Sequence, residues 1–72
     1  MKIIVCGAGQ VGSSIARQLS MENNDVTIVD QSQKLVLQIS DAIDVQGVVG
    51  HASRPDDLER AGIADADMII AV

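Results

Sequence analysis

The chain has 72 residues, of which 47% are apolar and none is aromatic, and its formal net charge at pH 7 is -5. This length suits one domain, and chains this short bury only about 60% of the surface that the unfolded form exposes. The acidic balance and the lack of aromatic stacking residues both disfavour nucleic-acid binding. With no membrane-spanning apolar run and no recognisable signal peptide, we expect a soluble, cytoplasmic domain.

The chain begins with a predicted strand and a predicted helix. Residues Lys2 to Cys6 form a nearly continuous apolar run, typical of a strand buried on both faces. A helix is predicted from Gln10 to about Ser20. Its apolar positions at helical spacing, and the small residues beside them, are Val11, Ile15 and Leu19, and Gly12 and Ala16. The small residues should let this helix lie close to the sheet.

A second strand and helix follow the turn signal at Asn23 and Asn24. The strand is predicted from Val26 to Asp30. Ser32 is a suitable N-cap for the next helix. Apolar residues recur every four positions in that helix, at Leu35, Ile39 and Ile43, with Val36 beside them. Residues Val45 to Gly50 then read as a third strand, weakened by Gly47.

The third helix has the clearest boundaries. Ser53 to Asp56 combines a capping-box-like spacing with an early proline, and Asp56 and Asp57 lie where the helix dipole favours anions. Gly62 is the expected stop signal. An apolar fourth strand is predicted from Met68 to Val72.

Alternation of strands and helices predicts an α/β fold with a Rossmann-like parallel sheet in three layers. The order along the chain is β-α-β-α-β-α-β, and right-handed crossovers give the sheet order 3-2-1-4. This is the first half of a doubly wound fold plus the strand across its switch point.

The glycine turn between the first strand and the first helix predicts a dinucleotide site. Gly7 allows the sharp turn, Gly9 leaves room for a pyrophosphate, and Gly12 permits close packing of helix on strand. Free backbone N–H groups around Gln10 and Val11 would point at the phosphates. The lysine of an ATP-hydrolysing phosphate loop is absent from the turn, so metal-assisted ATP hydrolysis has no support.

Asp30 ends the second strand, at about the spacing from Gly12 that the dinucleotide fingerprint requires. It is placed to accept hydrogen bonds from the ribose hydroxyls of adenosine, and its charge would repel a 2′-phosphate. NAD or NADH is therefore favoured over NADP. The alternative is that the turn and Asp30 are only a tight connection and a carboxylate at a strand end.

Three further groups of residues are weaker candidates. Cys6 reads as a small buried core residue, and a redox role would need a lowered thiol pKa. His51, at the same sheet edge as Asp30, could touch the adenosine moiety or be a solvated loop residue. The acidic pairs resemble catalytic carboxylates, although capping and loop solvation account for them: Asp56 with Asp57, and Asp65 with Asp67. No metal site is expected.

Four segments together resemble the RCK/KTN family of NAD-binding regulatory domains in bacterial Trk potassium uptake systems. They are Lys2–Gly12, Glu22–Asp30, Gly50–Gly62 and Ala66–Val72, and they span nearly the whole chain. The Gly50–Gly62 segment is a second signature that ordinary dehydrogenases lack. The match therefore favours a regulatory domain over a dehydrogenase.

The resemblance implies that Gly7, Ala8, Gly9, Gln10 and Val11 form the pyrophosphate loop. It implies that Asp30 is the ribose acid and that His51 and Ala52 lie beside the adenosine, where many relatives carry an acidic residue. NAD or NADH is the implied ligand, and ATP or ADP could occupy the same site. The ligand would bias the conformation of a homo-oligomeric ring that docks on a TrkH/TrkG-like membrane transporter subunit at the cytoplasmic face of the inner membrane.

The family's domain is longer than this chain, so residues 1–72 read as the N-terminal part of one such domain, with Met68–Val72 as an apolar edge. We expect weak stability or association in isolation. Two other classes stay open: the coenzyme-binding half of an NAD-dependent oxidoreductase, and a fragment without nucleotide affinity. The lack of catalytic partners and of a substrate domain disfavours catalysis within this chain.

Overall fold

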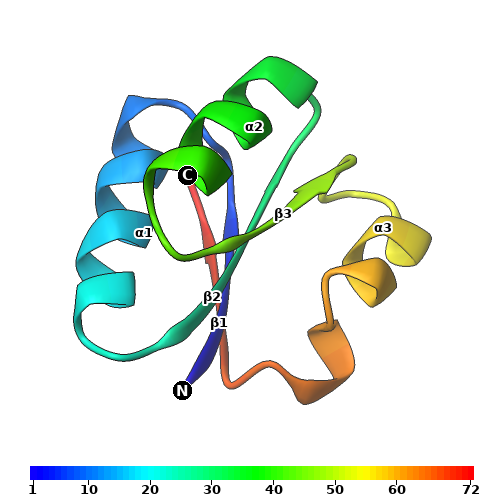
Figure 1. The fold of residues 1–72 in the computed structure, drawn as a ribbon. Helices are drawn as coiled ribbons and strands as arrows, with labels where there is room; N and C mark the ends of the chain where they lie inside the picture. The colour runs from blue at the N-terminus through cyan, green and yellow to red at the C-terminus, as the bar shows by residue number, and fades with distance from the viewer.

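The computed structural model describes all residues from 1 to 72 and contains a four-stranded parallel sheet with order β3-β2-β1-β4. Its elements in chain order are β1 (Lys2–Cys6), α1 (Gln10–Met21), β2 (Asp25–Asp30), α2 (Gln33–Ala42), β3 (Gln46–Val49), α3 (Pro55–Arg60), the 3-10 helix η1 (Ile63–Asp65) and β4 (Met68–Ala71). The predicted element order and sheet order are confirmed. The strands run the same way, so their carboxyl ends share one edge, toward the top of Figure 1.

Alternating side chains of the central strands enter two separate cores. Ile3 and Val5 face α1 and α2, whereas Ile4 and Cys6 face α3. Figure 1 shows α1 and α2 over one face of the sheet and α3 over the other. The core under α1 and α2 contains seven buried residues, and the core on the α3 side contains four. The three-layer Rossmann-like arrangement is therefore confirmed, with one face covered more heavily.

β4 is the edge strand beside β1, and much of its apolar surface is open. In the register of β1 and β4, Ile69 lies beside Ile4, so both side chains are on the α3 face of the sheet. On that face 45% of Ile69 is exposed. Ile70 lies on the other face and packs against the larger core. The free backbone edge and exposed side chains of β4 agree with the apolar edge that the sequence predicts.

Two expectations about helix positions are wrong. The spacing predicts Val11 on the buried face of α1, yet 63% of it is exposed. The buried positions of this helix are Gly12 and Ala16, because contact between backbones requires small residues there and turns Val11 toward solvent. Ser53 does not cap α3, since the N-cap is Arg54, with no side-chain hydrogen bond.

Other signals lie where expected. Ser32 caps α2, its hydroxyl accepting from the Leu35 N–H at 3.2 Å. Gly62 follows α3 with φ of 90°, the left-handed conformation that ends helices. The short helix η1 between Gly62 and β4 has no counterpart among the predicted elements, because three residues carry too little periodicity to be recognised.

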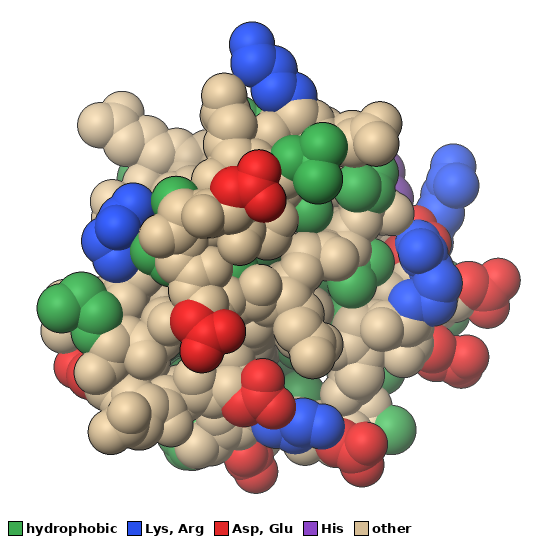
Figure 2. Space-filling view, in the orientation of Figure 1, with side chains coloured by type: hydrophobic (Ala, Val, Ile, Leu, Met, Phe, Trp, Pro, Cys, Tyr) green, Lys and Arg blue, Asp and Glu red, His purple; other side chains and the backbone are tan.

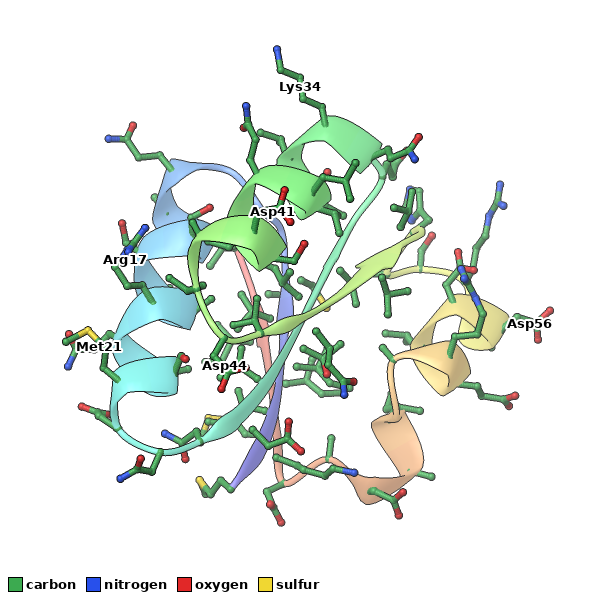
Figure 3. All side chains as sticks on the ribbon, viewed as in Figure 1. Arg17, Met21, Lys34, Asp41, Asp44 and Asp56 are labelled. Atoms are coloured by element: carbon green, nitrogen blue, oxygen red, sulfur yellow. The ribbon has the colours of Figure 1, made fainter.

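The charged side chains show no single-sign cluster on the face in Figure 2, where basic and acidic groups are interspersed. Figure 3 shows Arg17, Lys34 and Asp41 extending outward from the two helices of that face. No helix in the structure is long and apolar enough to span a membrane.

Candidate functional site

The turn from β1 into α1 depends on two glycines. Gly7 adopts φ of 119°, which side-chain-bearing residues rarely do. At Gly12, an added Cβ would collide with the Gly7 carbonyl oxygen and lie 2.8 Å from the Gly7 carbonyl carbon. The helix therefore presses directly on the turn, and both glycines are needed for the fold itself.

Gly9 is different, because the protein itself does not require a glycine there. Its φ of -71° and ψ of -166° are open to any residue, and no atom lies within 4 Å of the position that a Cβ would take. The first hydrogen bond of the helix runs from Ser13 N–H to the Gly9 carbonyl at 2.9 Å. The N–H groups of Gln10 and Val11 are thus free of helical partners beside an open space.

Asp30 links the end of β2 to the glycine turn. Its Oδ2 accepts from the Ala8 N–H at 2.8 Å, and its Oδ1 accepts from the Ser32 N–H at 2.8 Å. A carboxylate offers about four acceptor positions, so about two remain for other donors. The structure therefore brings two predicted site features, Ala8 of the turn and Asp30, into direct contact.

Two cavities adjoin along the carboxyl ends of the strands, and together we call them the rim trough. The inner cavity, of about 230 Å³, is lined by Cys6, Gly7, Val29, Asp30, Gln31, Gly50, His51, Ala52, Ala71 and Val72. The outer cavity, of about 270 Å³, is lined by Gln31, Val49, Gly50, His51, Arg54, Asp57 and Arg60. Predicted residues from β1, β2 and the loop after β3 therefore share one hollow, as expected for ligand sites in open α/β sheets.

Two other hollows are each larger than either single cavity of the rim trough. One of about 410 Å³ is at the opposite end of the sheet, beside Asn23 and Asp44. Another of about 310 Å³ runs between α1 and α2, reaching Gly9 and Gln10 at one end and Ala42 at the other. Neither includes Asp30 or His51, so size alone does not identify the predicted site.

Asp57 holds the loop that carries His51 and Ala52. Its Oδ2 accepts from the His51 N–H at 2.8 Å, and its Oδ1 accepts from the Arg60 guanidinium at 2.8 Å. Arg60 also donates to the Val49 carbonyl at 3.0 Å, which ties α3 to the end of β3. A Cβ on Gly50 would lie 2.8 Å from the Asp57 carboxyl carbon, so the glycine makes room for this contact.

The sequence places Asp57 in the first turn of α3 but does not reveal its contact with His51. Asp57 is the third residue of the helix after its N-cap, where acidic side chains reach back to preceding N–H groups. This position in the helix indicates that Asp57 accepts a hydrogen bond from a preceding N–H group. Which N–H group it contacts depends on the path of the loop, which the sequence does not show. Asp56, the neighbouring carboxylate, points away into solvent (Figure 3).

Asp57 should make stability depend on pH. The hydrogen bonds from His51 N–H and Arg60 lower the pKa of Asp57 below its ordinary value of 3.8. A lowered folded-state pKa means that ionised Asp57 stabilises the fold above the unfolded pKa, and that this contribution is lost as pH falls through the folded pKa. We therefore expect Asp57→Asn to lower the free energy of unfolding at pH 7, with a gap from wild type that narrows below about pH 4.

Urea denaturation followed by circular dichroism at pH 7, 5 and 3 measures this gap. Asp56→Asn is the matched control, because it removes the neighbouring charge without touching His51 or Arg60. An equal gap at pH 7 and pH 3 for Asp57→Asn would contradict the assigned role.

The contacts and burial of the remaining candidates, Cys6, Asp65 and Asp67, fit structural roles. Burial raises the pKa of the Cys6 thiol, which opposes the thiolate that redox chemistry needs. Asp67 Oδ2 accepts from the Lys2 N–H at 2.8 Å, joining the starts of β4 and β1. Asp65 belongs to η1, outside the rim trough. The acidic pairs therefore do not assemble into a two-carboxylate site.

The chain matches known proteins along its whole length. The family model described as the TrkA-N domain covers residues 3–72. The Trk system potassium uptake protein TrkA of Azorhizobium caulinodans is 58% identical over all 72 residues, and that of Vibrio alginolyticus is 53% identical. A TrkA homolog from Pyrococcus abyssi is 35% identical.

These relatives are longer than the matched region. The chain spans 16% of the Azorhizobium and Vibrio proteins and 32% of the Pyrococcus protein. The match nevertheless includes the glycine turn, Asp30 and the loop of His51, since it begins at residue 3 and continues through residue 72. The chain therefore belongs to the TrkA-N domain family.

Proposed function

We propose that the rim trough and the glycine turn beside it together bind NAD or NADH and that the domain serves as a regulatory, non-catalytic part of a potassium uptake protein. The observation that carries this proposal is the contact between Ala8 N–H and Asp30 Oδ2 at 2.8 Å, which joins the glycine turn to Asp30. In the proposal the turn binds the phosphates and Asp30 binds the ribose. ATP or ADP could use the same turn and acid, since they share the adenosine and the phosphates.

This proposal assigns a binding or structural role to each predicted site residue. Gly9 leaves the space that the pyrophosphate would fill, and the free N–H groups of Gln10 and Val11 face its charge. Gly7 and Gly12 shape the turn. Asp30 uses its remaining acceptor positions for the ribose hydroxyls. His51 and Ala52 form the wall beside the adenosine.

The regulatory part of the proposal rests on the relatives, which are named as potassium uptake proteins. Residues 1–72 would form the first part of one nucleotide-binding domain in a homo-oligomeric ring at the cytoplasmic face of the inner membrane. The ring would dock on a TrkH/TrkG-like transporter subunit. A ligand shifts such an assembly only if it binds its conformations with different affinity. No observation in the trough favours the oxidoreductase alternative.

Calorimetric titration of the chain with NADH, ATP and NADPH tests the binding proposal. We expect saturable binding of NADH and ATP, weaker binding of NADPH, and no consumption of NADH. Absence of binding at millimolar NADH and ATP would contradict a nucleotide site and support a fragment without nucleotide affinity.

Asp30→Asn tests the ribose assignment. The substitution keeps a side chain of the same shape but removes the charge that binds the ribose and repels a 2′-phosphate. Its amide nitrogen cannot accept, so one of the contacts from the Ala8 and Ser32 N–H groups is lost as well. Because hydrogen bonds to charged groups contribute about 1.5–3 kcal/mol, we expect NADH affinity to fall roughly tenfold or more. NADPH affinity should fall less, so the preference for NADH narrows. An unchanged ratio between the two ligands would argue against the ribose contact.

A further inference from the structure

The orientation of His51 is fixed by Ser53, two residues along the chain. The Ser53 backbone N–H donates to His51 Nδ1 at 3.1 Å, and the Ser53 hydroxyl oxygen lies 2.6 Å from the same nitrogen. A backbone N–H can only donate, so Nδ1 must present its lone pair. In a neutral imidazole the proton then resides on Nε2.

The backbone of His51 is held as firmly as its ring. Its N–H donates to Asp57 at 2.8 Å, and its carbonyl accepts from the Arg54 N–H at 2.9 Å, which closes the turn. His51 lines both cavities of the rim trough. With the backbone and Nδ1 engaged, Nε2–H is the polar group of this residue that remains for a ligand.

We propose that Ser53 is a positioning residue that fixes His51 as an Nε2–H donor, and that His51 donates to a ring nitrogen of an adenine base in the rim trough. This inference rests on the proposed nucleotide site. The unsubstituted ring nitrogens of adenine are acceptors, so a fixed donor complements them. A carboxylate in the same place could only accept and would favour the amino group of the base instead.

A pair of substitutions separates the two nitrogens of His51. In His51→Asn, the amide oxygen can take the place of Nδ1 and keep the contact with Ser53, but no donor reaches the position of Nε2. In His51→Gln, the amide nitrogen can reach the position of Nε2. One hydrogen bond contributes about 0.5–1.5 kcal/mol, so we expect AMP to bind His51→Asn about threefold to tenfold more weakly than His51→Gln.

Two probes distinguish the base from a phosphate as the acceptor. AMP carries both groups, whereas ribose 5-phosphate carries no base. We expect the two His51 variants to bind ribose 5-phosphate equally. A difference between them for ribose 5-phosphate that equals the difference for AMP would overturn the assignment to the base.

The tautomer itself is measured by nitrogen-15 NMR on the ligand-free chain. We expect an unprotonated Nδ1 and a protonated Nε2 near neutral pH. Ser53→Ala keeps the backbone N–H that donates to Nδ1 but loses the hydroxyl, the second group in contact with it, so we expect Nε2 to stay the main protonated nitrogen with a smaller excess than in wild type. Ser40→Ala on α2 should leave the tautomer population unchanged. A wild-type ring protonated mainly on Nδ1 would overturn the inference.

Failure of this inference differs from failure of the proposed function. If wild-type chain binds neither AMP nor NADH, the nucleotide site is wrong and this inference falls with it. If both ligands bind wild type, but His51→Asn and His51→Gln bind AMP equally, the nucleotide site stands and the donor role of His51 is wrong.

Discussion

Gly12→Ala should strongly destabilise the fold, because the added methyl group has no space. The new Cβ would collide with the Gly7 carbonyl oxygen and lie 3.2 Å from a methyl group of Val72. The first obstacle is backbone, so relief requires moving α1 away from the sheet. Overpacking of this kind costs about 3 kcal/mol. A domain of this size has about 4–11 kcal/mol of stability in total.

Urea denaturation followed by circular dichroism measures the loss. Gly9→Ala is the matched control in the same turn, because its site is open and its backbone conformation is ordinary. We expect Gly9→Ala to cost at most about 1 kcal/mol, the usual penalty for alanine at an N-cap. Equal stability of Gly12→Ala and wild type would show that α1 does not press on the turn as the structure has it.

The two glycines also show how far the sequence predicts the site. The spacing of the turn assigns Gly12 to packing and Gly9 to ligand approach, and the structure gives them different surroundings. Gly12 has no room for a side chain, and Gly9 has open space. The predicted role of Gly12 in packing is thus confirmed by the fold. The role of Gly9 in ligand binding stays a prediction, which the open space beside Gly9 supports.

Strands and helices were predictable because buried runs and helical spacing repeat over many residues. Residues Lys2–Cys6 form a strand as expected, since both faces of the sheet are covered there. The prediction that Val11 is buried is wrong because it rests only on the helical spacing from Ile15 and Leu19. It does not take into account how closely Gly12 approaches the sheet. An apolar stripe gives the buried side of a helix only approximately when small residues make the contact.

Contacts within the loop after β3 were less predictable. The sequence shows an acidic residue near the start of α3, but the bond from His51 N–H to Asp57 depends on the path of the loop and on the room at Gly50. The contact of Ser53 with His51 likewise replaces the capping role expected of Ser53. Such contacts join residues without periodicity, so they become visible only in three dimensions.

Gly9→Asp should abolish nucleotide binding while leaving the fold intact. Gly9 is the N-cap of α1, where aspartate and asparagine are preferred residues, and an acidic group there also suits the helix dipole. The same carboxylate would stand where the proposed pyrophosphate lies. Two unit charges 4 Å apart repel by about 4 kcal/mol near a protein surface, so we expect NADH affinity to fall at least about a hundredfold.

Gly9→Asn is the control that separates charge from size, because asparagine has nearly the shape of aspartate and caps helices equally well. It should weaken NADH binding less than Gly9→Asp, and both variants should denature at wild-type urea concentrations. Wild-type affinity in Gly9→Asp would exclude a phosphate group from this turn.

In the full-length protein, a stable Gly9→Asp variant that no longer binds NADH should also lose NADH-dependent control of potassium uptake. Uptake that responds to NADH as in wild type would separate the nucleotide site from transport, because a ligand can regulate only through the site that it occupies.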